Sequence, residues 1–283
     1  MKKFVVALLA AFTAIAALAS SAYVTNGVIT ITGYDYSAGA ICSFKIAGYE
    51  YLDARDHGRC LQSASSFDNQ GEAFNPTEAG AGVDGYMPHA STSLLQSWSA
   101  IGNVITTQNQ MAFWAPKYIV GLAFPVRSNH IHKKTVTLNY LGKPNVIEYK
   151  ISFTIPTNET HTLGQFEILT GYMPSEFSTF QYISTVDGLL YPLSDGPGEQ
   201  DFPVILSTSD GAKAMGIWMP IKPPPGSGYG RWRFNDCVKW NVVDRVNYPA
   251  PGSTRNYRVF VVAGTRDQVR AGLIDLYLNE PHT

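Results

Sequence analysis

The sequence predicts an all-β protein, a large antiparallel β-sandwich with long loops and one short C-terminal helix. Three observations support this fold class. Apolar and polar residues alternate through much of the chain, as in strands with one buried and one wet face. Turns containing glycine and proline separate these segments. A helical period is found only near the C-terminus.

The first 22 residues, MKKFVVALLAAFTAIAALASSA, have the parts of a secretory signal peptide. Lys2 and Lys3 form the basic start and an apolar run follows. Either residues 17–19 or 20–22 supply a small-residue cleavage site. The run is shorter than the roughly 20 apolar residues of a membrane helix. We therefore expect residues 1–22 to be removed and residues 23–283 to form one secreted or periplasmic domain without a membrane anchor.

The clearest predicted element is an antiparallel hairpin in the middle of the chain. Apolar residues alternate with polar ones over 135–140 and again over 147–155, and the turn Gly142–Asn145 joins the two runs. Shorter runs of the same kind predict further strands at 28–31, 40–46, 49–52, 165–170, 214–219 and 257–263. Long irregular connections are expected at 56–92, 184–202 and 221–230.

The helix is predicted to follow Thr265. Thr265 and Gln268 form a capping box, and Val269, Leu273 and Leu276 then recur on one face.

The composition limits the classes of partner. The formal net charge is −1 and only 15% of residues are charged, so no nucleic-acid footprint is visible. Three cysteines allow at most one disulfide, and the pairing among Cys42, Cys60 and Cys237 stays open. A bridge involving Cys60 would brace the polar segment in which it lies.

That polar segment, residues 56–84, concentrates acids, amides, a histidine and an arginine without helical period. Binding and catalytic side chains gather on such loops. In an extended chain His57 and Arg59 share one face, where His57 would act as a general base and Arg59 would bind hydroxyls or a carboxylate. The alternative is a structural role for both residues, in which Arg59 pairs with an acid and His57 is a satisfied hydrogen-bonding residue. Gln62 is a further candidate for substrate binding.

The second half of the segment, NPTEAG, adds two carboxylates and an amide. Glu78 would serve as acid or base, and Asn75 and Asp84 would contact substrate. The alternative is a turn that Asn75–Pro76 starts and Gly80 ends.

A third group comes from residues 159–172. His161, Gln165 and Glu167 share the parity opposite to Phe166 and would form the floor of a polar cleft, with Tyr172 beyond as a proton donor or stacking ring. A solvated outer face would show the same alternation.

Aromatic rings complete the candidate set. Trp232 and Trp240 would stack on sugar rings, although most of the aromatic residues are expected in the core. No metal site is predicted, because His130-x-His132 lacks partners at a known spacing. No cofactor is expected either, because phosphate-loop and dinucleotide motifs are missing from the sequence.

Residues 39–62, GAICSFKIAGYEYLDARDHGRCLQ, resemble the opening strands of the galactose mutarotase-like supersandwich, and residues 258–265 resemble its close. The resemblance implies a β-sandwich whose concave face binds saccharide, with Arg59 contacting sugar hydroxyls. Aldose epimerases of this group rely on a His and a distant Glu, parts that His161 or His57 would take with Glu167. The segments DHGR (residues 56–59) and NPTEAG (residues 75–80) differ from the epimerase sequence pattern.

Together these observations predict a secreted enzyme that cleaves glycosidic bonds in an oligo- or polysaccharide. Glu78 and Glu167 would form the carboxylate pair of a glycoside hydrolase. Alternatives are a polysaccharide lyase with a His or Tyr base and Arg59, an aldose epimerase, or a glycan-binding protein without catalysis. A separation of the two carboxyl groups beyond about 10 Å would exclude the hydrolase pair.

Overall fold

The computed structural model describes residues 21–115, 126–220 and 228–281. Of the expected signal peptide, only Ser21 and Ala22 are among them, and both belong to the first strand.

A four-stranded antiparallel sheet begins the fold, in the order β1-β2-β3-β4. Its strands are β1 Ser21–Thr25, β2 Ile29–Tyr34, β3 Ile41–Ile46 and β4 Tyr49–Glu50. The last three lie where the sequence predicts strands. Strand β1 contacts two strands of the larger sheet, β7 Leu94–Ile101 and β8 Val104–Phe113, so the small sheet lies beside that sheet.

The larger antiparallel sheet runs in the order β13-β12-β15-β16-β19-β10-β9-β8-β6-β5-β11-β18-β17-β14, with β7 paired to β8. Its strands are β5 Gln62–Phe67, β6 Pro76–Thr77, β7 Leu94–Ile101, β8 Val104–Phe113, β9 Arg127–Thr137, β10 Val146–Thr154, β11 Leu163–Pro174, β12 Thr179–Ile183, β13 Leu190–Pro192, β14 Gly198–Gln200, β15 Val204–Ser207, β16 Ala214–Trp218, β17 Gly228–Arg233, β18 Cys237–Asn247 and β19 Thr254–Gly264.

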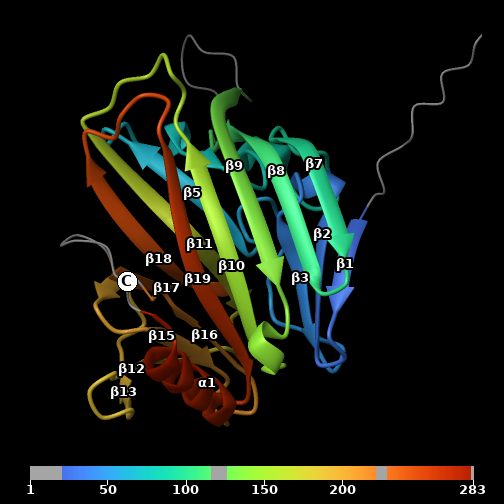
Figure 1. The fold of residues 1–283 in the computed structure, drawn as a ribbon, viewed down its shortest axis with the longest axis vertical. Helices are drawn as coiled ribbons and strands as arrows, with labels where there is room; N and C mark the ends of the chain where they lie inside the picture. The colour runs from blue at the N-terminus through green and yellow to red at the C-terminus, as the bar shows by residue number, and fades with distance from the viewer. Residues whose placement is uncertain (1–20, 116–125, 221–227, 282–283) are drawn as a thin grey trace, which may run out of the picture.

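This sheet folds over on itself into two layers (Figure 1). Strands β8, β9, β10 and β19 form the front layer in Figure 1, and β5, β11 and β18 lie behind them. The predicted antiparallel sandwich is therefore confirmed.

The main core fills the space between the layers. The predicted hairpin is β9 paired with β10, and every second residue of β10 from Ile147 to Phe153 is buried. Phe166 of β11 and Trp240 of β18 meet these residues from the rear layer. The alternation read from the sequence thus marks the surface that the two layers bury.

The C-terminal helix α1, Arg266–Asn279, begins as predicted, with Thr265 and Gln268 in a capping box. Val269, Leu273 and Leu276 are buried against β15, β16 and β19, and Figure 1 shows α1 covering the lower end of these strands. In the described ranges, no helix has the length and apolar character that crossing a membrane requires.

The connection expected at 56–92 is less irregular than predicted. It contains β5 and β6, which are central strands of the larger sheet. The sequence of β5, QSASSF, conceals this because serines, not apolar residues, occupy its buried positions Ser63 and Ser65. The stretch 184–202 likewise contains β13 and β14, and residues 221–227 lie outside the described residues.

The cysteine pairing that the sequence left open is Cys42 with Cys60. The bridge joins β3 to the segment that precedes β5. Cys237 is a free, buried thiol at the start of β18.

Candidate functional site

A small pocket with a volume of about 80 Å³ opens on the rear layer. Strands β5, β6, β11 and β18 form its floor, and the segments around residues 58, 72 and 114 form its wall. The lining residues are Gly58, Gln62, Ala64, Glu72, Asn75, Thr77, Trp114, Glu167, Thr170, Tyr172 and Lys239. Their neighbours along β11 and β18, such as Phe166 and Trp240, point into the core, so the pocket lies on the opposite face of this layer.

A β-bulge in β11 sets which of its side chains face the pocket. Pairing of β11 with β5 and β18 shifts register after Glu167. Ile168 and Leu169 are consecutive and both fully buried in the core. The extra residue reverses the parity, so Thr170 returns to the face that Glu167 occupies. Without the bulge, strict alternation would turn it inward.

Glu167 lies at the centre of the polar lining. Lys239 Nζ lies 3.1 Å from Glu167 Oε2, and Thr170 Oγ1 donates to the same oxygen at 2.7 Å. Burial by itself raises the pKa of Glu167, but the Lys239 charge and these hydrogen bonds outweigh it and hold the pKa below its ordinary value of 4.5. Glu167 is therefore an ionised carboxylate that can accept a proton.

Tyr172 is the complementary group. Its ring centre lies 5.3 Å from Lys239 Nζ, which also lies 4.7 Å from the Trp232 ring. Burial raises the pKa of the Tyr172 phenol, so this group keeps its proton. The pocket thus joins a proton acceptor and a proton donor whose environments push their pKa values apart.

The rest of the lining consists of polar groups and one indole. Gln62 is held in place, because its Nε2 donates to the His57 carbonyl at 2.9 Å and its Oε1 accepts from Ala79 N at 3.0 Å. The Trp114 ring packs on the backbone of Gly58, where a Cβ would lie 2.6 Å from it. Glu72, which is exposed, brings a second carboxylate to the lining.

Four of the sequence-predicted residues come together here, namely Gln62, Asn75, Glu167 and Tyr172. Lys239, Glu72 and Thr170 were missed. Lys239 stands in a strand of mostly buried residues, and only the pairing of Lys239 with Tyr172 across β11 and β18 brings it to the pocket.

Glu78 is not in the pocket, which corrects the expected carboxylate pair. It is fully buried and forms an ion pair with Lys134 of β9, which is fully buried as well. Its other oxygen accepts from Ser63 N at 2.9 Å. The side chain points into the core because Thr77, its neighbour along the chain, lines the pocket. A substrate in the pocket does not meet this carboxylate.

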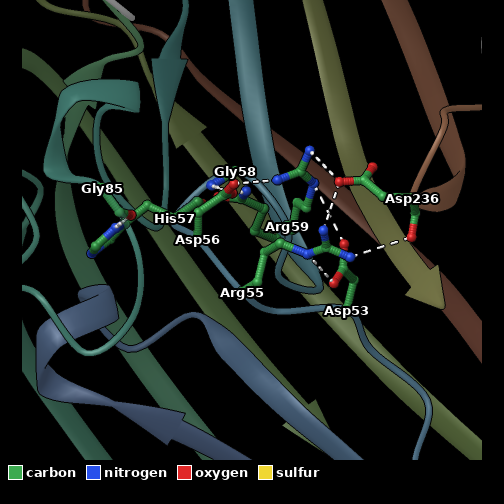
Figure 2. Close-up of polar contacts among 9 residues, drawn as sticks. Asp53, Arg55, Asp56, His57, Gly58, Arg59, Gly85 and Asp236 are labelled. Carbon is green, nitrogen blue, oxygen red and sulfur yellow. Dashed lines mark hydrogen bonds and ion pairs between the residues drawn. The ribbon is translucent and has the colours of Figure 1, made fainter.

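His57 and Arg59 take the structural alternative (Figure 2). His57 is 1% exposed, and its ring nitrogens lie 3.1 Å and 3.0 Å from the carbonyl oxygens of Gly85 and Tyr36. Arg59 forms ion pairs with the carboxylates of Asp53, Asp56 and Asp236. Neither side chain lines the pocket, although Gly58 between them does.

Three other polar candidates also hold the fold together. Asp84 accepts hydrogen bonds from Ala81 N and from Thr92. Gln165 has the parity of Glu167, but its Oε1 accepts from Arg245 Nε at 2.8 Å. His161 precedes β11 and stacks on Phe67, so the polar row expected along one face is broken.

The two tryptophans differ in position. Trp240 is fully buried in the core, where its indole packs against Gly171, so it cannot stack on a ligand. Trp232 pairs with Lys239 across β17 and β18 and lies beside the pocket without lining it. Trp114 is the indole that the pocket offers.

Comparison with known proteins finds similarity in structure. A galactose mutarotase related enzyme from Lactobacillus acidophilus is 14% identical, with 88% of this chain and 99% of that chain covered and a TM-score of 0.46. The alpha-galactosidase from Lactobacillus brevis is 8% identical, with 87% of this chain and 39% of that chain covered and a TM-score of 0.50. The 4-alpha-glucanotransferase from Thermococcus litoralis is 8% identical, with 86% of this chain and 37% of that chain covered and a TM-score of 0.49.

The likeness is one of fold. At 8% identity and a TM-score of 0.50, the match with the alpha-galactosidase shows a shared fold alone. No protein-family model matches the sequence, and no curated protein matches it either.

Proposed function

We propose that this protein is a carbohydrate-active enzyme and that its substrate binds in the pocket around Glu167. The observation that carries the proposal is the lining itself. An ionised carboxylate, an ammonium, amides and a half-buried indole share one small hollow. Amides and hydroxyls match the hydroxyls of a sugar, and an indole face matches the C–H face of its ring. The fold shared with the alpha-galactosidase agrees with this assignment.

Cleavage of a glycosidic bond is the leading reaction. Within the described ranges, Glu72 and Glu167 are the carboxyl groups that line the pocket. Glu167, held ionised by Lys239, would act as base or nucleophile, and Glu72 would replace Glu78 as the acid that protonates the leaving oxygen. Asn75 and Gln62 would orient the sugar.

A second reaction is favoured by the pairing of Glu167 with Tyr172. Opening a sugar ring needs one group to accept the anomeric hydroxyl proton and another to protonate the ring oxygen. Glu167 and Tyr172 have the protonation states that such an epimerase needs. Elimination from a uronide is less well supported, because Arg59 is paired with acids away from the pocket and Tyr172 holds its proton.

We further propose that the protein works outside the cytoplasm. The N-terminal residues have the composition of a signal peptide, and the Cys42–Cys60 disulfide is typical of oxidising compartments. Ser21 and Ala22 pair with β2, which favours cleavage after Ala19 over cleavage after Ala22.

The test is a screen of the purified mature protein against a panel of oligo- and polysaccharides. Reducing ends report hydrolysis, ultraviolet absorbance reports elimination, and exchange of anomers followed by nuclear magnetic resonance reports epimerisation. We expect Glu167→Gln to lower turnover by about 100- to 10,000-fold while the sugar still binds, as for loss of a general acid or base.

Glu176→Gln, on an exposed turn outside the pocket, is the matched control and should keep full activity. Glu72→Gln separates the two reactions, because only hydrolysis uses Glu72. Turnover that survives in Glu167→Gln would overturn the catalytic assignment. If the wild type bound a sugar but formed no product, the protein would be a glycan-binding protein without catalysis.

A further inference from the structure

A second cluster of chemistry-bearing side chains lies away from the pocket. His130 is on β9, and Glu159 and His161 are on the connection between β10 and β11. Nε2 of His130 lies 2.9 Å from Glu159 Oε2, and Nε2 of His161 lies 3.4 Å from the same oxygen. One ligand atom from each residue fits within 4.8 Å of the other two.

Two of the three separations are close to those in a metal coordination sphere. Tetrahedral zinc with bonds near 2.0–2.1 Å places its ligand atoms roughly 3.3 Å apart. The two nitrogen–oxygen distances lie on either side of that value. We propose that His130, Glu159 and His161 bind a divalent transition-metal ion, best matched by Zn²⁺.

The surroundings of His161 support the proposal. Its Nδ1 lies 2.8 Å from Asp68 Oδ2. With Nδ1 donating to this carboxylate, Nε2 would be the nitrogen that offers a lone pair to an ion beside Glu159. The other oxygen of Asp68 accepts from the backbone of Thr162 and Leu163, which fixes the carboxylate. Histidines that bind zinc usually donate their other ring N–H to a carboxylate, a carbonyl or a water, and Asp68 can accept from His161 in this way.

Packing fixes the two imidazoles before any ion binds. Both rings lie against Phe67, with ring centres 4.3 Å away for His161 and 4.7 Å for His130. The side chains of His130 and His161 are 4% and 11% exposed, whereas that of Glu159 is 26% exposed. The ion would therefore have three protein ligands with access from solvent for a water as the fourth.

The ion would tie the β10–β11 connection to β9 at one end of the core. Phe67 packs on Phe166 in that core, whereas the pocket lies on the other face of β11. The metal site therefore neither depends on the proposed sugar chemistry nor shares a residue with it.

The experiment measures zinc binding directly. Full mature protein is stripped with a chelator and dialysed, and ZnCl₂ is then titrated calorimetrically. Co²⁺ is added in parallel, because its visible spectrum reports nitrogen and oxygen coordination. We expect one ion per chain and a higher melting temperature with zinc. Glu159→Gln and His161→Gln should each weaken binding at least tenfold, and Asp68→Asn by about 10- to 100-fold.

His89→Gln is the matched control, because His89 is exposed and lies outside the cluster. It should bind zinc as the wild type does. Glu159→Gln changes the most exposed member and guards against loss of folding in the histidine variants. No saturable zinc binding by the wild type would overturn the proposal, as would equal affinity in Glu159→Gln and the wild type.

Discussion

Glu167 and Glu78 show how the same residue type takes opposite roles on the two faces of one sheet layer. Glu167 lines the pocket beside Lys239, and Glu78 is buried beside Lys134. Each carboxylate is paired with a lysine, but only the first can be reached by a ligand. The two pairs differ in exposure, not in residue type, and only the partly exposed pair is a candidate for catalysis.

The pH dependence of activity should follow the pKa of Glu167. Lys239 lowers this pKa below 4.5, so the base form persists as the pH falls and is lost only when the pH passes the lowered value. The Lys239→Met variant removes the cation and should move the acid limb of the rate profile to higher pH. The measurement is kcat/KM against pH for wild type and variant. An unmoved acid limb would show that another group controls it.

The buried pair of Glu78 and Lys134 should contribute to stability. Removing one member leaves an unpaired charge in the core, and each of Glu78→Gln and Lys134→Met should lower the free energy of unfolding by about 3–5 kcal/mol. The double variant should lose less free energy of unfolding than the two single variants lose together. Urea unfolding measures all three. If Glu78→Gln were as stable as the wild type but inactive, Glu78 would return to the catalytic set.

At the scale of the element, β11 carries most of the candidate site. Its bulge supplies Glu167, Thr170 and Tyr172 to one face, although their spacing in sequence does not fit a regular strand. The same strand places Gly171 against the Trp240 ring, where a Cβ would lie 2.5 Å away. The glycine is there for packing.

Gly171→Ala should therefore destabilise the protein by about 1–3 kcal/mol, the usual cost of overpacking a core. Thermal and chemical unfolding measure the effect. The Trp240→Phe variant lacks the clashing part of the ring. In that background, Gly171→Ala should destabilise the protein by less. Equal costs in the two backgrounds would argue against the contact as the cause.

At the scale of the whole molecule, the small sheet is joined covalently to the segment that leads into the pocket wall. The Cys42–Cys60 bridge spans 18 positions in sequence. Gly58, two residues before Cys60, lines the pocket. The bridge thus connects β3 to the wall.

Replacing Cys42 and Cys60 together by serine should lower the free energy of unfolding by about 3 kcal/mol, through the larger entropy of the unfolded chain. A reductant should lower the free energy of unfolding of the wild type by the same amount. It should leave the free energy of unfolding of the double variant unchanged. Thiol titration of the unfolded, unreduced wild type should find one free thiol, Cys237. Two or three free thiols would exclude the bridge.

The sequence by itself determined the fold class, the β9–β10 hairpin and the capped helix, because alternation and capping depend on neighbours along the chain. It also proposed Glu167 and Tyr172, which lie in one polar stretch and both line the pocket. Only the tertiary structure decided that Lys239 and Trp114 join them, that Glu78 faces the core, and that His130 meets His161. Strand pairing and a one-residue bulge set these relations, and neither leaves a local pattern in the sequence.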